Sequence, residues 1–432
     1  MNFMYQRFST FIDHINSGST RDKLVMLSIL LFPTLSMSAR HWLSGIFTLL
    51  AIVALFVTFR GHRKLYKEEK VFLVLLALYI LCFFISATLN DWSVNSIRRV
   101  GNVMKYVFFF PLYLLIRQYT DLHRLLLVGI VIGGIVLGLQ ALYDVLVSGN
   151  TQAWGIYGPI VFGDLSVLFF AITLILVIFN NRLTLSTYIL TFALLMAVLA
   201  GLLSGSRNAW VAAVFSVLII PFLCFPYVKY KKTLLLLPVI IFIISATTFA
   251  LNNSMQDRLA LAYNEVKTYL TQGAPENIPI KSNSAGYRLE QWRVAMHIYK
   301  DAPFFGHGGG NAGKNVNRYA EKGLAHPDMI NLDTETTIGG LHNTYFEALV
   351  NEGIIGLVII LMFLLYPLWI FIRTRKYNPL LSTIGIVFMA NYLIFGITEN
   401  PFVHDNFTSV YLLFLAVFFS EAVRSKYTAQ AS

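Results

Sequence analysis

Long apolar runs separated by short polar segments make up most of this 432-residue chain. A helix needs about 20 apolar residues to cross the hydrocarbon core of a bilayer. The runs are near this length, so they predict an all-α integral membrane protein. Twelve transmembrane helices are expected, at residues 22–38, 42–59, 71–89, 103–118, 122–147, 160–180, 183–203, 208–228, 233–251, 353–373, 379–397 and 407–424.

The pattern is interrupted once, by a long polar segment between the ninth and tenth runs. Connections longer than about 15 residues are usually functional or disordered. Two sets of apolar residues in this segment recur at helical spacing and predict amphipathic helices: Leu259, Tyr263, Val266 and Leu270, and then Leu289, Trp292, Met296 and Tyr299. We therefore expect three parts: residues 1–251 with nine membrane helices, residues 252–352 as a loop domain at the membrane surface, and residues 353–432 with three more helices and a tail.

Composition excludes the common soluble classes. The chain is 56% hydrophobic and only 13% charged, whereas soluble domains carry about 25% charged residues. A chain this apolar is neither a large soluble enzyme nor a disordered protein, and it lacks the basic soluble face of a nucleic-acid-binding domain. Cys82 and Cys224 lie inside apolar runs, which predicts buried thiols and no structural zinc site.

The net charge of +11 is distributed unevenly along the chain. If the N-terminus is cytoplasmic, alternate short loops on that side carry nineteen Lys and Arg residues, and the opposite short loops carry five. Positive charge marks the cytoplasmic side of membrane proteins. The bias predicts that both termini are cytoplasmic and that residues 252–352 are extracytoplasmic.

The few arginines on the extracytoplasmic side are candidate anion ligands. Arg207 follows Ser204-Gly205-Ser206 in a tight turn; it is either a snorkelling loop arginine or a guanidinium that binds an anion. Arg288 opens an amphipathic helix, whose free N–H groups also favour an anion, although a surface role is the alternative. Arg98 and Arg99 precede the run at 103–118 and are expected mainly at the surface.

His342 stands where the polar segment turns into the tenth membrane run, and it shares a helix face with Tyr345. Histidine is the natural general base near neutral pH, but a lone histidine is more often structural. The nearest candidate for a metal-binding carboxylate pair, Asp333 and Glu335, lies in a polar stretch that is typical of a solvated loop. No metal or other cofactor is expected.

Taken together, these residues resemble the O-antigen ligase family, which is related to O-antigen polymerases and to bacterial protein O-oligosaccharyltransferases. The layout of twelve spans with one large late loop resembles that of the family. The local matches are Arg207, the stretch Arg288…Trp292…Pro303-x-x-Gly306-x-Gly308, and His342 followed after ten residues by Gly353.

One position departs from the family pattern, which has Arg-x3-Leu where this chain has Trp292 after Arg288. This departure leaves Arg293 open as an alternative to Arg288. The resemblance implies a glycosyltransferase-C-like fold in the bacterial inner membrane. It also implies inverting, metal-independent transfer of a glycan from undecaprenyl diphosphate to a sugar hydroxyl of lipid A–core, at the periplasmic face. Arg207 and Arg288 would bind the diphosphate, and His342 would take the acceptor proton.

Three other functions stay open at this point. An O-antigen polymerase uses the same donor with a second lipid-linked glycan as acceptor, and a protein O-oligosaccharyltransferase uses a protein. A lipid-linked glycan transporter belongs to a different class, and its ionisable residues are expected near mid-span. Here Arg207, Arg288 and His342 are expected at one face instead, which favours chemistry at the membrane surface.

Overall fold

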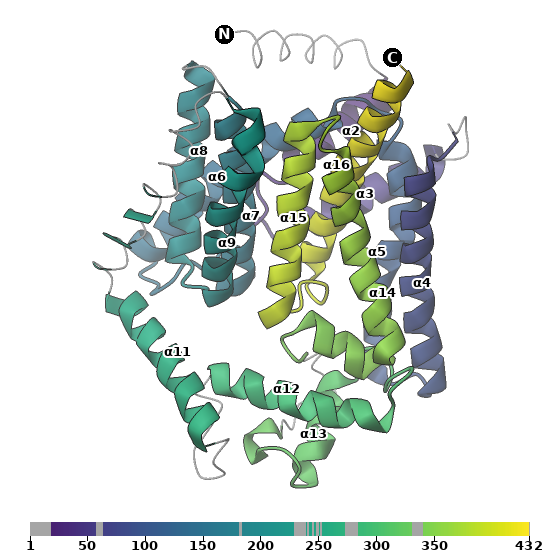
Figure 1. Ribbon diagram of the computed structural model, residues 1–432, viewed down its shortest axis with the longest axis vertical. Coiled ribbons are helices and arrows are strands. Elements are labelled where there is room, and N and C mark those ends of the chain that lie inside the picture. The colour runs from purple at the N-terminus through teal and green to yellow at the C-terminus, as the bar shows by residue number, and fades with distance from the viewer. Residues whose placement is uncertain are drawn as a thin grey trace.

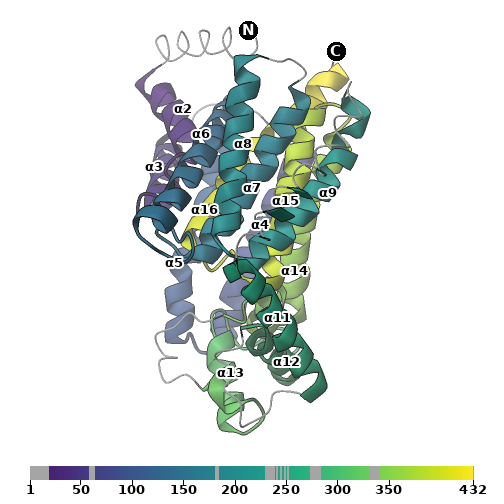
Figure 2. The same ribbon diagram turned by 90° about the vertical axis from the view of Figure 1, so that its left-hand side faces the viewer.

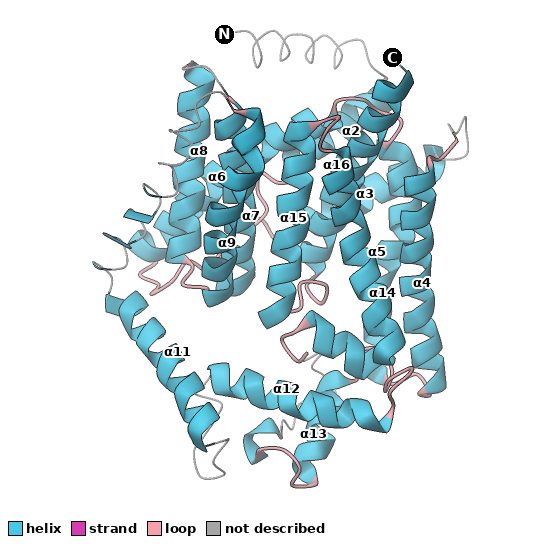
Figure 3. Cartoon of the chain, in the orientation of Figure 1, coloured by secondary structure: helices cyan, strands magenta, loops and turns pink. Residues whose placement is uncertain are grey.

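The structure is a computed structural model that describes residues 19–57, 64–180, 184–228, 253–272, 284–330 and 340–431, with six further positions between 239 and 250. These residues form helices joined by turns and loops, and no strand occurs among them (Figure 3). The prediction of an all-α membrane protein is therefore confirmed.

The helices fall into an N-terminal and a C-terminal set, separated by a stretch that is mostly outside the described residues. The N-terminal set consists of α2 (Thr20–Leu31), α3 (Trp42–Val57), α4 (Lys67–Leu89), α5 (Val94–Ile116), α6 (Leu122–Leu142, continued by a π turn at Tyr143–Val147), α7 (Pro159–Phe179), α8 (Leu185–Leu203) and α9 (Arg207–Cys224). The C-terminal set consists of α11 (Asn253–Gln272), α12 (Ser284–Asp301), α13 (Ala312–Glu321), α14 (Thr344–Thr374), α15 (Pro379–Thr398) and α16 (Asp405–Ala431).

Nine helices in the described part of the chain are long and apolar enough to span a membrane: α4 to α9 and α14 to α16. The expected spans 22–38 and 42–59 correspond to α2 and α3, which have only 12 and 16 residues. α2 ends at Leu31 although Phe32 keeps helical dihedral angles, because Pro33 has no N–H with which to continue the helical hydrogen bonds. The expected span 233–251 lies mostly outside the described residues, so the structure does not support the count of twelve.

α5 is longer than the apolar run from which it was predicted. It begins at Val94, capped by Ser93, instead of at residue 103. The helix contains three cationic side chains. Arg98 is exposed, and the two buried ones are paired: Arg99 with Glu347 at 2.9 Å and Lys105 with Asp405 at 2.5 Å. Buried charges are tolerated when they are paired in this way, and a hydropathy count cannot detect such partners.

The membrane helices stand side by side, with α7 and α16 at the centre of the bundle (Figures 1 and 2). The C-terminal end of α16 lies at one end of the bundle, and α11, α12 and α13 form a layer at the other end (Figure 1). Near the end of α16, Arg424 donates to the carbonyl oxygens of Arg117 and Tyr119, and Lys426 pairs with Glu68. The basic residues and the long polar segment are thus at opposite ends.

The predicted amphipathic segments are helical and form most of this end layer. α11 packs on α12, and α12 in turn packs on α14. The apolar residues of α11 point outward, with Leu259, Tyr263 and Leu270 between 54% and 74% exposed. The inner face of α12 is buried through Val294, Ala295 and Ile298. α12 is therefore held against α13 and the start of α14 by its apolar face.

Candidate active site

His342 occupies a tight turn immediately before α14. Its φ of +47° is in the left-handed region that few residues other than glycine adopt, and such strained conformations are often found at functional sites. Its Nδ1 atom lies 3.1 Å from Oε2 and 3.3 Å from Oε1 of Glu399. The turn is held from both sides, because the Asn343 side chain caps α14 and also donates to the carbonyl oxygen of Ile397.

Glu399 follows the last residue of α15 and is contacted by two imidazoles. His404 Nε2 lies 3.5 Å from Oε1 of the same carboxylate. The Glu399 side chain is 8% exposed, whereas the His342 and His404 side chains are 41% and 39% exposed. Burial alone would raise the pKa of Glu399, but its hydrogen bonds with the two histidines outweigh burial and hold that pKa well below its usual range. The carboxylate is therefore ionised at neutral pH.

The two predicted anion ligands lie beside this group. Arg288 projects from the first turns of α12, and its neighbours in the electrostatic field are Glu399, Arg207 and Asp164. Burial lowers the pKa of Arg288, Arg207 lowers it further, and the two carboxylates act in the opposite direction. Arginine nevertheless stays protonated in proteins. Arg288 is thus within electrostatic range of both Arg207 and Glu399, and we call Arg207, Arg288 and the His342–Glu399 pair the cluster, although they come from four separate segments.

Arg207 is the first residue of α9, and its Nη1 lies 3.4 Å from Oε2 of Glu265 on α11. The Glu265 side chain is only 5% exposed and also accepts a hydrogen bond from the backbone N–H of Ala285 at the start of α12. Asp164 lies on α7 and is fully buried, with one oxygen bonded to Asn208 at 2.8 Å. The charge of Arg207 is therefore partly neutralised by the buried Glu265 carboxylate.

The remaining candidate residues have other contacts. Arg99 pairs with Glu347 in the bundle, Arg293 pairs with Glu290 on its own helix, and Tyr345 donates to the carbonyl oxygen of Leu393. Arg98 is exposed on α5. Arg99 is buried, so the expectation of a surface position is wrong for this residue and agrees with the structure for Arg98. Of the two arginines left open on α12, Arg288 is the one in the cluster.

The glycine motifs have a structural cause, because the segment after α12 and the first turns of α14 are bonded through their backbones. His307 N–H donates to Val350 O at 2.9 Å, and Ile354 N–H donates to Pro303 O at 2.8 Å. Gly353 has a φ of +70°, and a Cβ atom there would lie 2.3 Å from the carbonyl oxygen of Phe304. We call this pairing of residues 303–308 with residues 350–355 the glycine clamp.

Trp292, the position that departs from the family pattern, secures the turn that carries His342. Its indole N–H donates to the carbonyl oxygen of Leu341 at 3.1 Å. Its ring stacks on Phe346, with the centroids 5.8 Å apart. A leucine here would supply apolar contact without the hydrogen bond. The tryptophan therefore fixes the geometry of the residue next to His342.

Residues 191–361 match the model of a family described as O-antigen ligase. This match covers about two fifths of the chain and shows that residues 191–361 are similar to the O-antigen ligase family. The chain is also 23% identical over 357 residues to an uncharacterised protein of Haemophilus influenzae, across 81% of this chain and 86% of that protein. The match supports a glycosyltransferase-like membrane enzyme of the O-antigen ligase and polymerase type. The matched region contains Arg207, Arg288, His342 and Gly353.

Glu399, His404 and Asp164 lie outside residues 191–361, the region that matches the family model, and the sequence alone did not assign them to the site. The signal for Glu399 was its position directly after an apolar run, where an acidic residue needs a partner. In the described part of the chain, no group of three or more His, Cys, Asp or Glu side chains has an arrangement suited to a metal ion.

Proposed function

We propose that this protein is an O-antigen ligase of the bacterial inner membrane. It transfers a glycan from undecaprenyl diphosphate to a sugar hydroxyl of lipid A–core at the periplasmic face. The single observation that carries the proposal is the cluster at one end of the membrane bundle, in which a histidine paired with a buried carboxylate lies beside two arginines. One part can remove a proton, and the other can hold a leaving diphosphate.

The arginines bind the diphosphate of the donor. Guanidinium groups make paired, charge-assisted hydrogen bonds with phosphate oxygens. As the bond between the sugar C1 atom and the diphosphate oxygen breaks, negative charge grows on that oxygen. Arg288 is half-buried, and preorganised positive charge is most effective where water is largely excluded. Arg207 and Arg288 therefore stabilise the leaving group and need no metal ion for that purpose.

His342 acts as the general base. Its Nδ1–H donates to the ionised Glu399 carboxylate, which leaves the lone pair of Nε2 to accept the proton of the acceptor hydroxyl. The acceptor oxygen attacks C1 from the face opposite the diphosphate, a new C–O bond forms, and the old C–O electron pair leaves with the diphosphate. The configuration at C1 is inverted. General-base catalysis of this kind typically contributes about 10²- to 10⁴-fold.

The charge distribution supports the proposed orientation. The basic residues around Arg424 and Lys426 lie at the end opposite the cluster. With this basic end in the cytoplasm, both termini are cytoplasmic, and α11 to α13 form the periplasmic layer. The diphosphate and the acceptor then meet at the membrane surface, where both lipid substrates are anchored.

A deletion strain tests the reaction. Its lipopolysaccharide is separated on gels before and after complementation with the wild type or with His342→Ala, and Tyr188→Phe on the exposed face of α8 is the matched control. A ligase predicts core without O-antigen, accumulation of lipid-linked polymer, and restoration by Tyr188→Phe but not by His342→Ala. Core carrying one repeat unit would instead identify a polymerase, and unchanged lipopolysaccharide would refute both.

Purified protein separates an enzyme from a transporter. In detergent there is no gradient and no second compartment, so a transporter produces no new covalent product. The proposal predicts that undecaprenyl-diphosphate-linked glycan and lipid A–core are joined under these conditions.

A further inference from the structure

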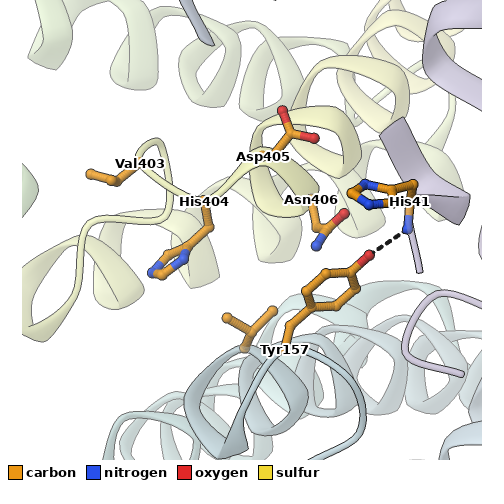
Figure 4. Close-up of a pocket in the computed structure, with 7 residues that line it drawn as sticks. His41, Tyr157, Val403, His404, Asp405 and Asn406 are labelled. Carbon is orange, nitrogen blue, oxygen red and sulfur yellow. Dashed lines mark hydrogen bonds between the residues drawn. The ribbon is translucent and has the colours of Figure 1, made fainter. Parts of the chain in front are cut away.

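A cavity of about 260 Å³ opens next to the His342–Glu399 pair. It lies between the loop that joins α2 to α3, the start of α7 and the loop that leads into α16 (Figure 4). His404 connects the cavity with the His342–Glu399 pair, because its ring lines the cavity and its Nε2 contacts Glu399. The cavity is therefore separated from the proposed general base by one shared carboxylate.

Five of the seven residues that line the cavity are polar, and the side-chain amide of one of them has no hydrogen-bond partner in the described part of the chain. That residue is Asn406, which is 6% exposed. Figure 4 shows this amide turned toward the ring of Tyr157. Because Asn406 lines the cavity, its amide is available to a ligand there, and it can both donate and accept hydrogen bonds. An amide that both donates and accepts here points to a ligand with hydroxyl groups.

The opposite wall of the cavity is formed by Tyr157 and His41. The backbone N–H of His41 donates to the Tyr157 hydroxyl at 2.7 Å, so the proton of that hydroxyl remains to be donated to a ligand. His41 itself has a φ of +56°. A second histidine in the left-handed region, beside the same site as His342, shows that the loop between α2 and α3 is held in an unfavourable conformation there.

Charge in the cavity excludes the diphosphate as its occupant. Asp405 lines the cavity, and its carboxylate is fixed by Lys105, whose Nζ also bonds Ser409 Oγ at 2.7 Å. No arginine or lysine among the described residues lines the cavity, and the charge of the nearby Lys105 is balanced by its ion pair with Asp405. The described lining therefore lacks a cation that could bind a phosphate. A carboxylate, an amide, a phenol and two imidazoles around a small apolar floor suit a neutral ring that carries several hydroxyls.

We infer that this cavity is a sugar-binding subsite that holds one sugar ring beside the reacting atoms. The inference rests on the proposed function. Pockets for drug-sized ligands measure about 300–1,000 Å³, so the cavity suits a single ring better than an extended chain. The ring belongs either to the acceptor, whose hydroxyl reaches His342, or to the donor, whose first sugar is attached to the diphosphate held by Arg288. Both sources present the same chemistry.

Two variants test the subsite in purified full-length protein reconstituted in nanodiscs. Tyr157→Phe removes only the phenolic oxygen, and Asn406→Ala removes the unpaired amide; Tyr188→Phe on exposed α8 is again the control. The donor and lipid A–core are varied separately in steady-state kinetics. Loss of one neutral hydrogen bond corresponds to about a 2- to 12-fold rise in KM. We expect that rise for one substrate, with kcat and the KM of the other substrate within about twofold of wild type.

The substrate whose KM rises identifies the source of the ring. The subsite is refuted if neither KM changes, or if both KM values and kcat shift together with a lower melting temperature, which is the signature of a structural defect. Failure of the proposed function looks different, because wild-type protein would then form no product at all. In that case, equilibrium binding of each lipid to wild type and Asn406→Ala still decides the subsite: weaker binding of one lipid supports it, and equal binding refutes it.

Discussion

The pair formed by His342 and Glu399 leads to the most direct prediction, for the substitution Glu399→Gln. Glutamine keeps the shape of the side chain and one hydrogen-bonding oxygen, but it removes the negative charge. The Glu399 side chain is only 8% exposed and lies 3.1 Å from His342, so solvent screens this charge weakly. When His342 takes the acceptor proton, the imidazolium loses its counter-charge in the variant, and the transition state is destabilised.

The size of the effect follows from the geometry. A hydrogen bond to a charged group contributes about 1.5–3 kcal/mol, which corresponds to a fall in kcat of about 10- to 150-fold. Arg288 loses one of its two neighbouring carboxylates, so the donor KM should not rise. The prediction is therefore a defect in kcat with donor binding retained.

The assay is the initial rate of joining the two lipid substrates in nanodiscs. Glu68→Gln is the matched control, because Glu68 is also a largely buried glutamate in an ion pair, but it binds Lys426 at the opposite end of the bundle. The control should retain at least half of wild-type activity. If Glu399→Gln stays within twofold of wild type while folding normally, the carboxylate does not support the base, and the assignment of His342 fails with it.

Three further predictions concern residues that support the site. Gly353→Ala should abolish folding or activity, because the new Cβ atom would lie 2.3 Å from a backbone oxygen, at a residue with a positive φ. Gly101→Ala is the control: its new Cβ atom would meet nothing within 4 Å, so the melting temperature should not change. Glu265→Gln should lower the donor KM by about 2- to 5-fold, because Arg207 loses a competing carboxylate; a higher KM would contradict this. Glu290→Gln should cost about 1–3 kcal/mol at pH 7, and the difference from wild type should disappear in unfolding scans well below pH 4.5.

The pH limit in the last prediction follows from the sign of the shift. Burial would raise the pKa of Glu290, but its hydrogen bonds with Arg293 and Tyr269 outweigh burial and lower that pKa below the usual 4.5. The unfolded chain therefore binds a proton before the folded protein does. The stabilisation is complete above the usual pKa and is lost as the pH falls through the folded value.

Much of the fold could be predicted from hydropathy alone, because most membrane helices read as uninterrupted apolar runs. The predicted helix ends are wrong where residues far apart in the sequence pair with each other or where a proline ends a helix. α5 extends nine residues beyond its apolar run because Arg99 finds Glu347 on α14, 248 positions away. α2 is shorter than its run because a proline follows it. A short window of sequence shows neither which distant residue a side chain pairs with nor how deeply that side chain is buried.

The site could be predicted only in part, for a related reason. Arg207, Arg288 and His342 belong to recognisable local motifs, so each could be singled out before the structure was known. Glu399 is 57 positions from His342 and has no motif of its own, and only the packing of α14 against α15 brings the two together. Backbone strain at His41 and His342 is likewise a property of the folded chain.

The glycine clamp ties two parts of the site together. Because the segment after α12 is hydrogen-bonded to the first turns of α14, the helix that carries Arg288 and the turn that carries His342 are joined through the backbone. Arg207 lies on α9, and its ion pair with Glu265 on α11 is a contact between a membrane helix and the layer formed by α11 to α13. A diphosphate bound by both arginines would add a second link between this layer and α9.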